Sequence, residues 1–173
     1  KKLAEKEIKA FVNDPKTLDD VYASIENIGE ALGEQMDAAN VVDEMKTKAV
    51  QSAAGFRPHR PTVFVQIAGE PLETAGRDSF ITDVISKAGG ISATGDMVLS
   101  GRGMSRDAAG RLDPDVIVIA ENENNREPNE TFGNSKAVKN RRIVRIEAKL
   151  LLRPGPRLAD AIEMLAKQLE QDS

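Results

Sequence analysis

The sequence predicts an α/β protein whose mainly parallel sheet is covered by helices on both faces. Short apolar segments alternate with amphipathic helical segments from Thr62 to the end of the chain, which is typical of βαβ units. The segment Val116–Ala120 is apolar at every position, as expected of a strand buried on both sides. With 173 residues, 40% of them hydrophobic and 30% charged, the chain can fill one globular domain, with or without an appendage.

The first third of the chain is predicted to contain a short strand and two helices. Ile8–Val12 alternates apolar and polar residues, which indicates a strand. Thr17 begins a helix as its N-cap, Asp20 completes a capping box, and Gly33 ends the helix. A second helix is expected from about Glu34 to Ala53. Its apolar side is formed by Met36, Ala39, Val42, Met45 and Ala49.

From Thr62 onward the predicted elements follow in regular order. Two prolines in the connector 55–61 separate them from the preceding helix. The predicted strands are Thr62–Ala68, Met97–Leu99, Val116–Ala120 and Ile143–Ile146, and the predicted helices are Asp78–Ala88, Ser105–Arg111, Asn134–Val138 and Pro156–Leu169.

The residue inventory argues against catalysis. The chain has no cysteine, which excludes thiol chemistry, disulfides and thiolate metal sites. Its single histidine, His59, lies between prolines in the connector. Ser79 and Ser105 therefore have no histidine to activate them, and both are placed to begin helices. The net charge of −4 also argues against a general nucleic-acid binder. We predict neither an enzyme nor a metal-ion site.

Four polar loops are expected at one edge of the sheet. Ligands of open α/β sheets bind outside the carboxyl ends of the strands. That edge collects the loops Gly69–Arg77, Ser100–Met104, Glu121–Thr131 and Ala148–Arg153. Their amides and charges can hydrogen-bond the periphery of a polar ligand, although surface loops are commonly polar in any case.

Five segments, taken in order, resemble the C-terminal lobe of the periplasmic binding proteins that deliver cobalamin, haem and ferric siderophores to ABC importers. They are Thr62–Ala68, Leu72–Gly90, Ser105–Ala120, Ala137–Ile146 and Arg153–Leu169. The resemblance is carried by the motifs TAGRDSF, SRDAAGRLDPDVIVI, AVKN and RPGPR and by their spacing. It implies an extracytoplasmic substrate-binding component, periplasmic or lipid-anchored, with its export signal outside this chain. Such a protein captures a metal chelate, a ferric siderophore or cobalamin, between two lobes and delivers it to the permease.

The resemblance also implies a domain organisation. Residues 1–16, with the strand 8–12, correspond to the end of an N-terminal lobe. Residues 17–57 form a helical segment, in which the helix 34–53 is the spine that joins the lobes. Residues 58–173 form the C-terminal α/β lobe, a three-layer Rossmann-like unit with a mainly parallel sheet.

The ligand contacts implied by the resemblance lie on three of the four loops. Many relatives place aromatic rings there, whereas this chain has Glu73, Gly101 and Leu150, and it contains no tryptophan. That difference disfavours flat aromatic ligands such as haem. It favours a hydroxamate or carboxylate chelate, or cobalamin held by hydrogen bonds. The implied contacts are Glu73, Thr74, Arg77, Gly101, Arg102, Lys149, Leu150 and Arg153; among them, Arg102, Lys149 and Arg153 suit an anionic ligand and Glu73 opposes one.

A docking residue is implied in the same way. Ser105-Arg106-Asp107 is similar to the family's Ser-x-Glu motif, whose carboxylate pairs with an arginine of the permease. Asp107 would be the docking acid. An acidic residue in the first turn of a helix is also stabilised by the helix dipole, which is the alternative explanation.

Two further readings of the sequence stay open. The chain could be a stand-alone α/β module that assembles as a homodimer through the exposed edge of the strand 8–12. It could also be a metal-handling protein related to the chelatase-like α/β folds, although a single histidine gives little support to that function.

Overall fold

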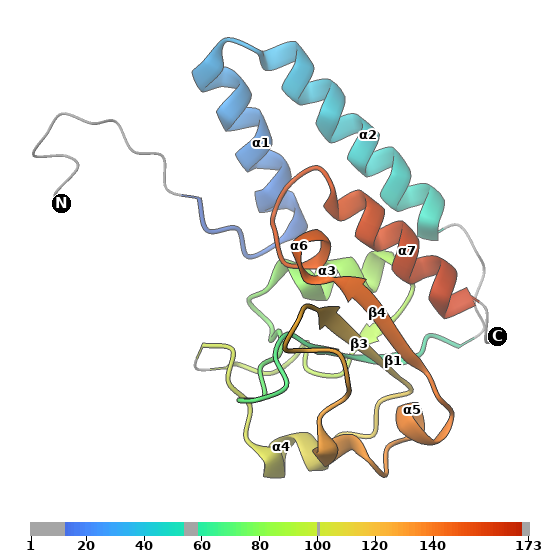
Figure 1. Cartoon of the computed structure of the whole chain (residues 1–173). Helices are drawn as coiled ribbons and strands as arrows, with labels where there is room; N and C mark the ends of the chain where they lie inside the picture. The colour runs from blue at the N-terminus through green and yellow to red at the C-terminus, as the bar shows by residue number, and fades with distance from the viewer. Residues whose placement is uncertain (1–12, 54–58, 100, 171–173) are drawn as a thin grey trace, which may run out of the picture.

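A computed structural model of the chain describes residues 13–53, 59–99 and 101–170 (Figure 1). The predicted strand Ile8–Val12, and with it the predicted homodimer edge, lies outside these ranges. Within them a helical hairpin, formed by α1 (Leu18–Leu32) and α2 (Gln35–Ala53), lies beside the last helix, α7 (Leu158–Glu170). The sheet lies below these helices in Figure 1, with shorter helices beyond it.

The cap residues of α1 are those that the sequence predicts. The Thr17 hydroxyl accepts a hydrogen bond from the Asp20 amide at 3.1 Å, and the Asp20 carboxylate accepts one from the Thr17 amide at 2.9 Å. Gly33 ends the helix with φ of 79°, a left-handed conformation that glycine adopts without strain.

Helix α2 packs through a face that differs slightly from the predicted one. Met36 is 81% exposed, and Ala38 rather than Ala39 is buried, because Ala38 continues the helical spacing of Val42, Met45 and Ala49. A side chain at Gly29 of α1 would bring its Cβ within 2.3 Å of the Ala38 Cβ, so the two helices approach closely there. The buried face of α2 consists of Ala38, Val42, Met45 and Ala49.

The sheet has four parallel strands in the order β2-β1-β3-β4. They are β1 (Thr62–Gln66), β2 (Ile91–Ser92), β3 (Val116–Glu121) and β4 (Ile143–Glu147). Both faces are covered by helices, which confirms the predicted three-layer α/β architecture. None of the described helices is long and apolar enough to cross a membrane.

One strand was predicted in the wrong place. Met97–Leu99 is not a strand; the Met97 carbonyl instead accepts a hydrogen bond from the Arg77 amide at 2.9 Å. The edge strand is Ile91–Ser92, which pairs with β1 directly after Gly90. A Cβ at Gly90 would lie 2.8 Å from a Val63 methyl carbon, so the chain reaches β1 only because this residue has no side chain.

The remaining helices are short, and two of them were not predicted. The one-turn helix α6 and the 3-10 helix η2 lie in segments that the sequence presents as loops, because four or three residues are too few to show a period. Their bounds are α3 (Phe80–Lys87), α4 (Arg106–Gly110), η2 (Glu130–Phe132), α5 (Lys136–Lys139) and α6 (Ala148–Leu151).

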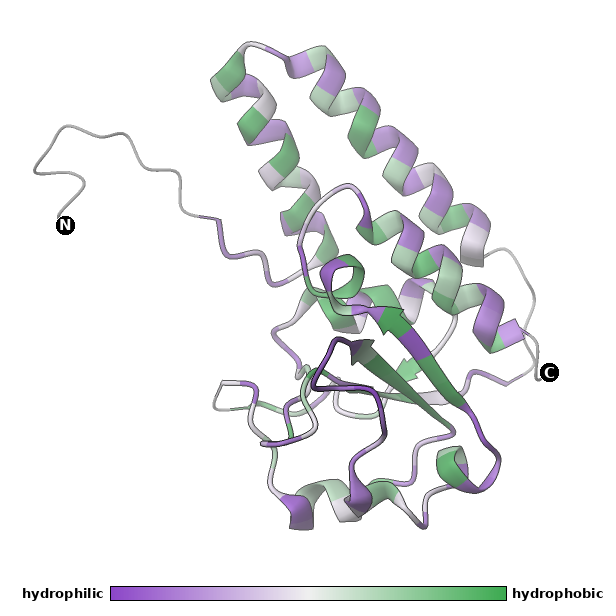
Figure 2. Cartoon of the chain, in the orientation of Figure 1, coloured by the Kyte–Doolittle hydropathy of each residue, from purple (hydrophilic) through white to green (hydrophobic). Residues whose placement is uncertain are grey.

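The two faces of the sheet bury separate apolar clusters. Val65 and Val118 point into the larger one, with α1, α2, α3 and α7. Phe64 and Ile119 point into the smaller one, where the Phe64 and Phe132 rings lie 4.5 Å apart. In Figure 2, β1 and β3 are mostly hydrophobic, whereas hydrophobic and hydrophilic residues alternate along the long helices.

Candidate functional site

Backbone hydrogen bonds join two of the predicted loops at the carboxyl edge of the sheet. The Thr74 amide donates to the Arg102 carbonyl at 2.9 Å, and the Met104 amide donates to the Leu72 carbonyl at 2.9 Å. Glu73 forms isolated bridges with Ala68 and Gly103. The loops 69–77 and 101–104 therefore form one connected layer above the strand ends, and we call the whole edge the rim.

A buried network of amides holds the third loop to the rim. Gln66, with no exposed surface, donates to Asn125 Oδ1 at 2.7 Å and to the Glu127 carbonyl at 2.9 Å, and its Oε1 accepts from the Asn129 amide at 2.8 Å. Asn125 Nδ2 donates to the carbonyls of Gln66, Ile67 and Ala120 at 2.9–3.2 Å. Such a fully bonded network rigidifies the loop 122–129.

This network is the feature of the site that sequence reasoning missed. The amide-rich stretch 122–125 reads as ligand-facing, but Asn125 is only 3% exposed and Asn129 only 9%. Asn129 Nδ2 also donates to the Gly69 carbonyl at 2.8 Å, which joins the loop to the end of β1. The one available signal is Gln66, a polar residue that ends an otherwise apolar strand.

Ion pairs between exposed side chains lie at the same part of the rim as the amide network. Arg106 lies between Glu130, at 2.5 Å, and Glu70, at 3.1 Å. The hydrogen bond to Glu70 and the nearby Glu130 charge raise the pKa of Arg106 further, so its positive charge is fixed. Arg145 makes a similar contact with Glu127 at 3.1 Å.

Asp107 follows the paired Arg106 and is itself exposed. Ser105 is the N-cap of α4, and its hydroxyl accepts from the Ala108 amide at 3.2 Å. Among the described residues the Asp107 carboxylate has no hydrogen-bond or ion-pair partner. The helix start therefore presents one unneutralised acid to the solvent.

A groove of about 480 Å³ lies at the other part of the rim. It brings together four of the predicted contacts, Thr74, Arg77, Gly101 and Arg102. Leu152 and Pro154, the residues on either side of Arg153, also line it. The segment 13–16 and the first residues of α3 complete its walls. Loops that are far apart in sequence thus meet in one depression.

The predicted contact residues are in different environments. Arg102, Lys149 and Arg153 are exposed, and within the described ranges their side chains have no partner. Gly101 is exposed with φ of 78°, and the Arg77 guanidinium donates to the Asp96 carbonyl at 2.9 Å. These side chains are available to a ligand.

Three predicted contacts need correction or restriction. Thr74 has no exposed surface, and its hydroxyl donates to the Val65 carbonyl at 2.8 Å. Leu150 is 7% exposed and packs in the larger apolar cluster as part of α6. Both shape the rim from below, because their side chains point into the protein. Glu73 is half-buried, and its backbone is bound by the neighbouring loops.

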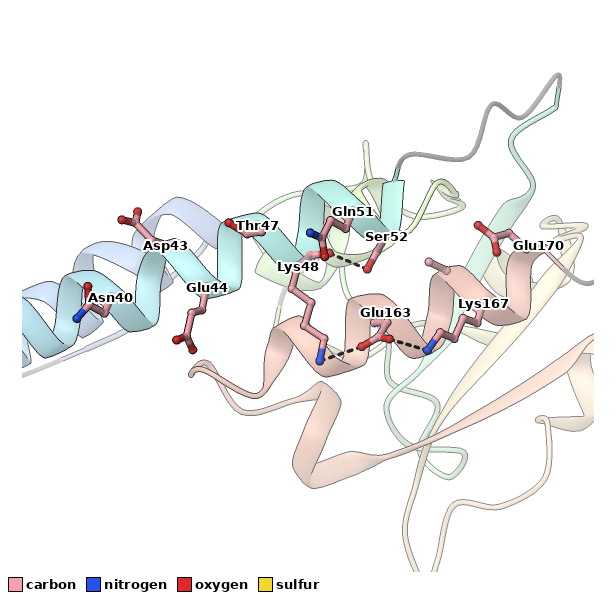
Figure 3. Close-up of a pocket in the computed structure, with 11 residues that line it drawn as sticks. Asn40, Asp43, Glu44, Thr47, Lys48, Gln51, Ser52, Glu163, Lys167 and Glu170 are labelled. Atoms are coloured by element: carbon pink, nitrogen blue, oxygen red, sulfur yellow. Dashed lines mark hydrogen bonds and ion pairs between the residues drawn. The ribbon is translucent and has the colours of Figure 1, made fainter.

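A second, larger depression of about 730 Å³ lies between α2 and α7 (Figure 3). Lys48 reaches from α2 to Glu163 of α7 at 2.8 Å and to Asp160 at 2.5 Å, and Glu163 also pairs with Lys167 at 2.5 Å. The bonds from Lys167 and Lys48 lower the pKa of Glu163 to about 2, and those to Asp160 and Glu163 raise the pKa of Lys48 to about 12. Lys48, Glu163 and Lys167 thus bind one another and join α2 to α7, so these three charges of the depression are already paired.

No metal centre is apparent in the part of the chain that the structure describes, where no three His, Cys, Asp or Glu side chains converge. His59 lies exposed in the connector. The chemistry that the rim offers is ion pairing and hydrogen bonding to a ligand.

Comparison with known proteins gives the same picture at the level of the whole chain. A protein-family model described as "Periplasmic binding protein" matches residues 2–150. An uncharacterized ABC transporter substrate-binding lipoprotein of Bacillus subtilis (strain 168), YvrC, is 30% identical over 169 residues, covering 94% of this chain and 54% of the relative. A vitamin B12-binding protein of Photorhabdus laumondii is 22% identical over 166 residues, covering 95% of this chain and 60% of the relative.

Solved structures have the same fold. A periplasmic haem-binding protein from Pseudomonas aeruginosa superimposes with a TM-score of 0.82 at 20% sequence identity, covering 99% of this chain and 67% of that protein. The predicted α/β lobe is therefore confirmed. The chain spans little more than half the length of the curated relatives it matches.

Proposed function

This chain belongs to the periplasmic binding protein family, and from that membership we propose that it forms the C-terminal lobe of a substrate-binding protein that captures a metal chelate for an ABC importer. Proteins of this family bind substrates for transport and are not enzymes. The proposed location is extracytoplasmic, either periplasmic or lipid-anchored, as the descriptions of the relatives indicate for those proteins.

The observation that carries the proposal is the groove at the carboxyl edge of the sheet. Three separate loops and the segment 13–16 converge on it, and exposed cationic side chains surround it. At about 480 Å³ it falls within the usual size of small-molecule sites, roughly 300–1,000 Å³. The outer side of a ligand held there would remain accessible to a second lobe.

We propose that α2 is the spine between two lobes and that residues 58–173 form the lobe described above. Three apolar side chains at the end of the α1–α2 hairpin support this organisation. Ile28 is 44% exposed, Leu32 is 71% exposed and Met36 is 81% exposed. Exposed apolar surface of this kind favours contact with a further structural unit.

The test of the function is calorimetry with the complete gene product and four chelates: iron(III) citrate, a neutral iron trihydroxamate, cyanocobalamin and haemin. We expect one of them to bind with a Kd of about 1 µM or below, equivalent to roughly −8 kcal/mol. A Lys48→Met variant is the control, because it alters the α2–α7 depression and leaves the rim intact. If none of the four chelates binds, the proposed function is wrong.

Docking to the permease is proposed for Asp107. Its carboxylate is exposed and unpaired among the described residues, so it can form an ion pair with a cationic partner. Asp107→Asn should abolish uptake of the chelate in cells and leave the Kd for the chelate unchanged. Asp37→Asn, which removes an acid from the first turn of α2, is the matched control. Normal uptake by Asp107→Asn would refute the docking role.

A further inference from the structure

We propose that the groove accepts an anionic, carboxylate-bearing chelate, and that Arg102 and Arg153 bind its carboxylates. This inference rests on the proposed function and names the ligand class of the same site. Guanidinium groups match carboxylates because both are planar and can form two parallel hydrogen bonds.

Several acids on the rim are already neutralised by ion pairs. The carboxylates of Glu70 and Glu130 are bound by Arg106, and that of Glu127 by Arg145. By contrast, the described structure gives no partner to the side chains of Arg102, Lys149 and Arg153. Three of the six acids on the rim loops are thus paired, and of the other three only Glu73 belongs to a loop beside the groove. The cations beside the groove have no ion-pair partner among the described residues.

The loop segments around the groove carry more cations than acids. In 73–78, 101–104 and 148–153 there are four cations, Arg77, Arg102, Lys149 and Arg153, and two acids, Glu73 and Asp78. Lys16 and Asp14, on the opposite wall, pair with each other at 2.8 Å. A local excess of positive charge in a chain of net charge −4 favours an anionic ligand.

The described part of the chain exposes little aromatic surface. The described residues include four aromatic rings, and all are buried: Tyr22 is 6% exposed, Phe64 0%, Phe80 9% and Phe132 1%. A planar macrocycle is normally held by contact with ring faces, and of these four rings only Phe80, which is 9% exposed, lines the groove. The described part of the groove therefore offers a ligand mainly charge and hydrogen bonds.

The backbone beside Arg102 leaves room for such a ligand. Gly101 has φ of 78°, and no atom lies within 4 Å of the position that a Cβ would occupy. The Arg102 carbonyl is engaged by the Thr74 amide at 2.9 Å. The backbone of the loop is thus anchored while the guanidinium remains exposed.

The experiment compares iron(III) citrate with the neutral iron trihydroxamate, cyanocobalamin and haemin by calorimetry on the complete gene product. We expect iron(III) citrate to bind most tightly and to bind more weakly as ionic strength rises from about 0.05 M to about 0.5 M. Arg102→Gln and Arg153→Gln should each weaken citrate binding by roughly tenfold or more. Arg102→Lys keeps the charge but loses the planar guanidinium group. Its affinity for iron(III) citrate should therefore lie between those of the two glutamine variants and that of the unaltered protein.

The matched control is Arg111→Gln, because Arg111 is exposed at the end of α4, on the way into β3 and away from the groove. Unchanged melting temperatures would show that the variants are folded. The inference is overturned if a neutral chelate or haemin binds most tightly, or if Arg102→Gln and Arg153→Gln bind citrate normally. In those cases the proposed substrate-binding function stands. If none of the four chelates binds, both that function and the inference about the ligand class are refuted.

Discussion

The rim has two sectors that look alike in sequence and differ in structure. The closed sector comprises Gln66, Glu70, Arg106, Asn125, Asn129 and Glu130, whose polar groups are bonded to one another. The open sector comprises Arg77, Gly101, Arg102, Lys149 and Arg153, whose exposed side chains line or flank the groove. Both sectors are rich in charges and amides, but the named side chains of the first are bonded to one another, whereas Arg102, Lys149 and Arg153 of the second have no partner in the described structure. A shallower depression of about 460 Å³ beside the closed sector is lined in part by exposed Glu123, Asn124 and Arg126.

A polar edge can therefore be rigid in one sector and open to a ligand in another. Buried amides must be hydrogen-bonded. In the closed sector these hydrogen bonds hold the loop 122–129 in place. That rigidity fixes the adjoining loop 69–77, which carries Arg77 and bonds to the backbone of Arg102. A binding site gains affinity when its loops are ordered before the ligand arrives.

The largest expected effect is a loss of stability when the hydrogen-bond network of the closed sector is broken. Gln66→Leu removes the side chain that bonds Asn125, Glu127 and Asn129 and leaves their groups buried without partners. We expect a loss of about 2–4 kcal/mol in the free energy of unfolding, measured in urea. Gln168→Leu, the same change at an exposed position of α7, should alter it by less than about 0.5 kcal/mol. Equal effects would mean that the network does not hold the rim.

An intermediate effect, on the affinity for the chelate, is expected when the ion pairs of the closed sector are removed. Arg106→Gln releases the carboxylates of Glu70 and Glu130 and so adds unpaired negative charge to the rim. Iron(III) citrate should bind severalfold more weakly, with little change in stability, because exposed ion pairs contribute little to folding. Arg106→Lys should restore most of the affinity. An affinity of Arg106→Gln equal to that of the unaltered protein would contradict the charge argument.

The smallest effect is expected outside the rim, in the Lys48–Glu163–Lys167 cluster. Because the pKa of Glu163 is lowered from 4.5 to about 2, its ion pairs stabilise the fold above pH 4.5, and this contribution is lost as pH falls toward 2. The Glu163 side chain is 34% exposed, so solvent screening keeps the effect small. Glu163→Gln should be slightly less stable than the unaltered protein at pH 7 and indistinguishable from it at pH 2. A stability difference between the two proteins that grows as pH falls would contradict the assigned direction of the pKa shift of Glu163.

Local chemistry explains what the sequence could predict of the fold. The caps at Thr17, Ser79 and Ser105 and the glycine at Gly33 act within a few residues, and the helices that they bound were predicted within two residues. Strand β2 was misplaced because two residues carry no periodic signal, and pairing with β1 defines it.

The site was predictable only in part, for a related reason. The loops of the rim follow from the parallel sheet, but which of their side chains are free depends on contacts between distant residues. Gln66 and Asn125 are 59 positions apart, and no local pattern connects them. The inward direction of Thr74 and Leu150 likewise comes from packing against the sheet.

The most direct test of the open sector as the binding site is hydrogen–deuterium exchange of the complete gene product, with and without the chelate that binds most tightly by calorimetry. We predict that the ligand slows exchange in 74–81, 99–104 and 149–154, and that 122–129 exchanges slowly whether or not the ligand is present. Protection confined to the α2–α7 depression, in 40–52 and 163–170, would contradict the assignment of the site.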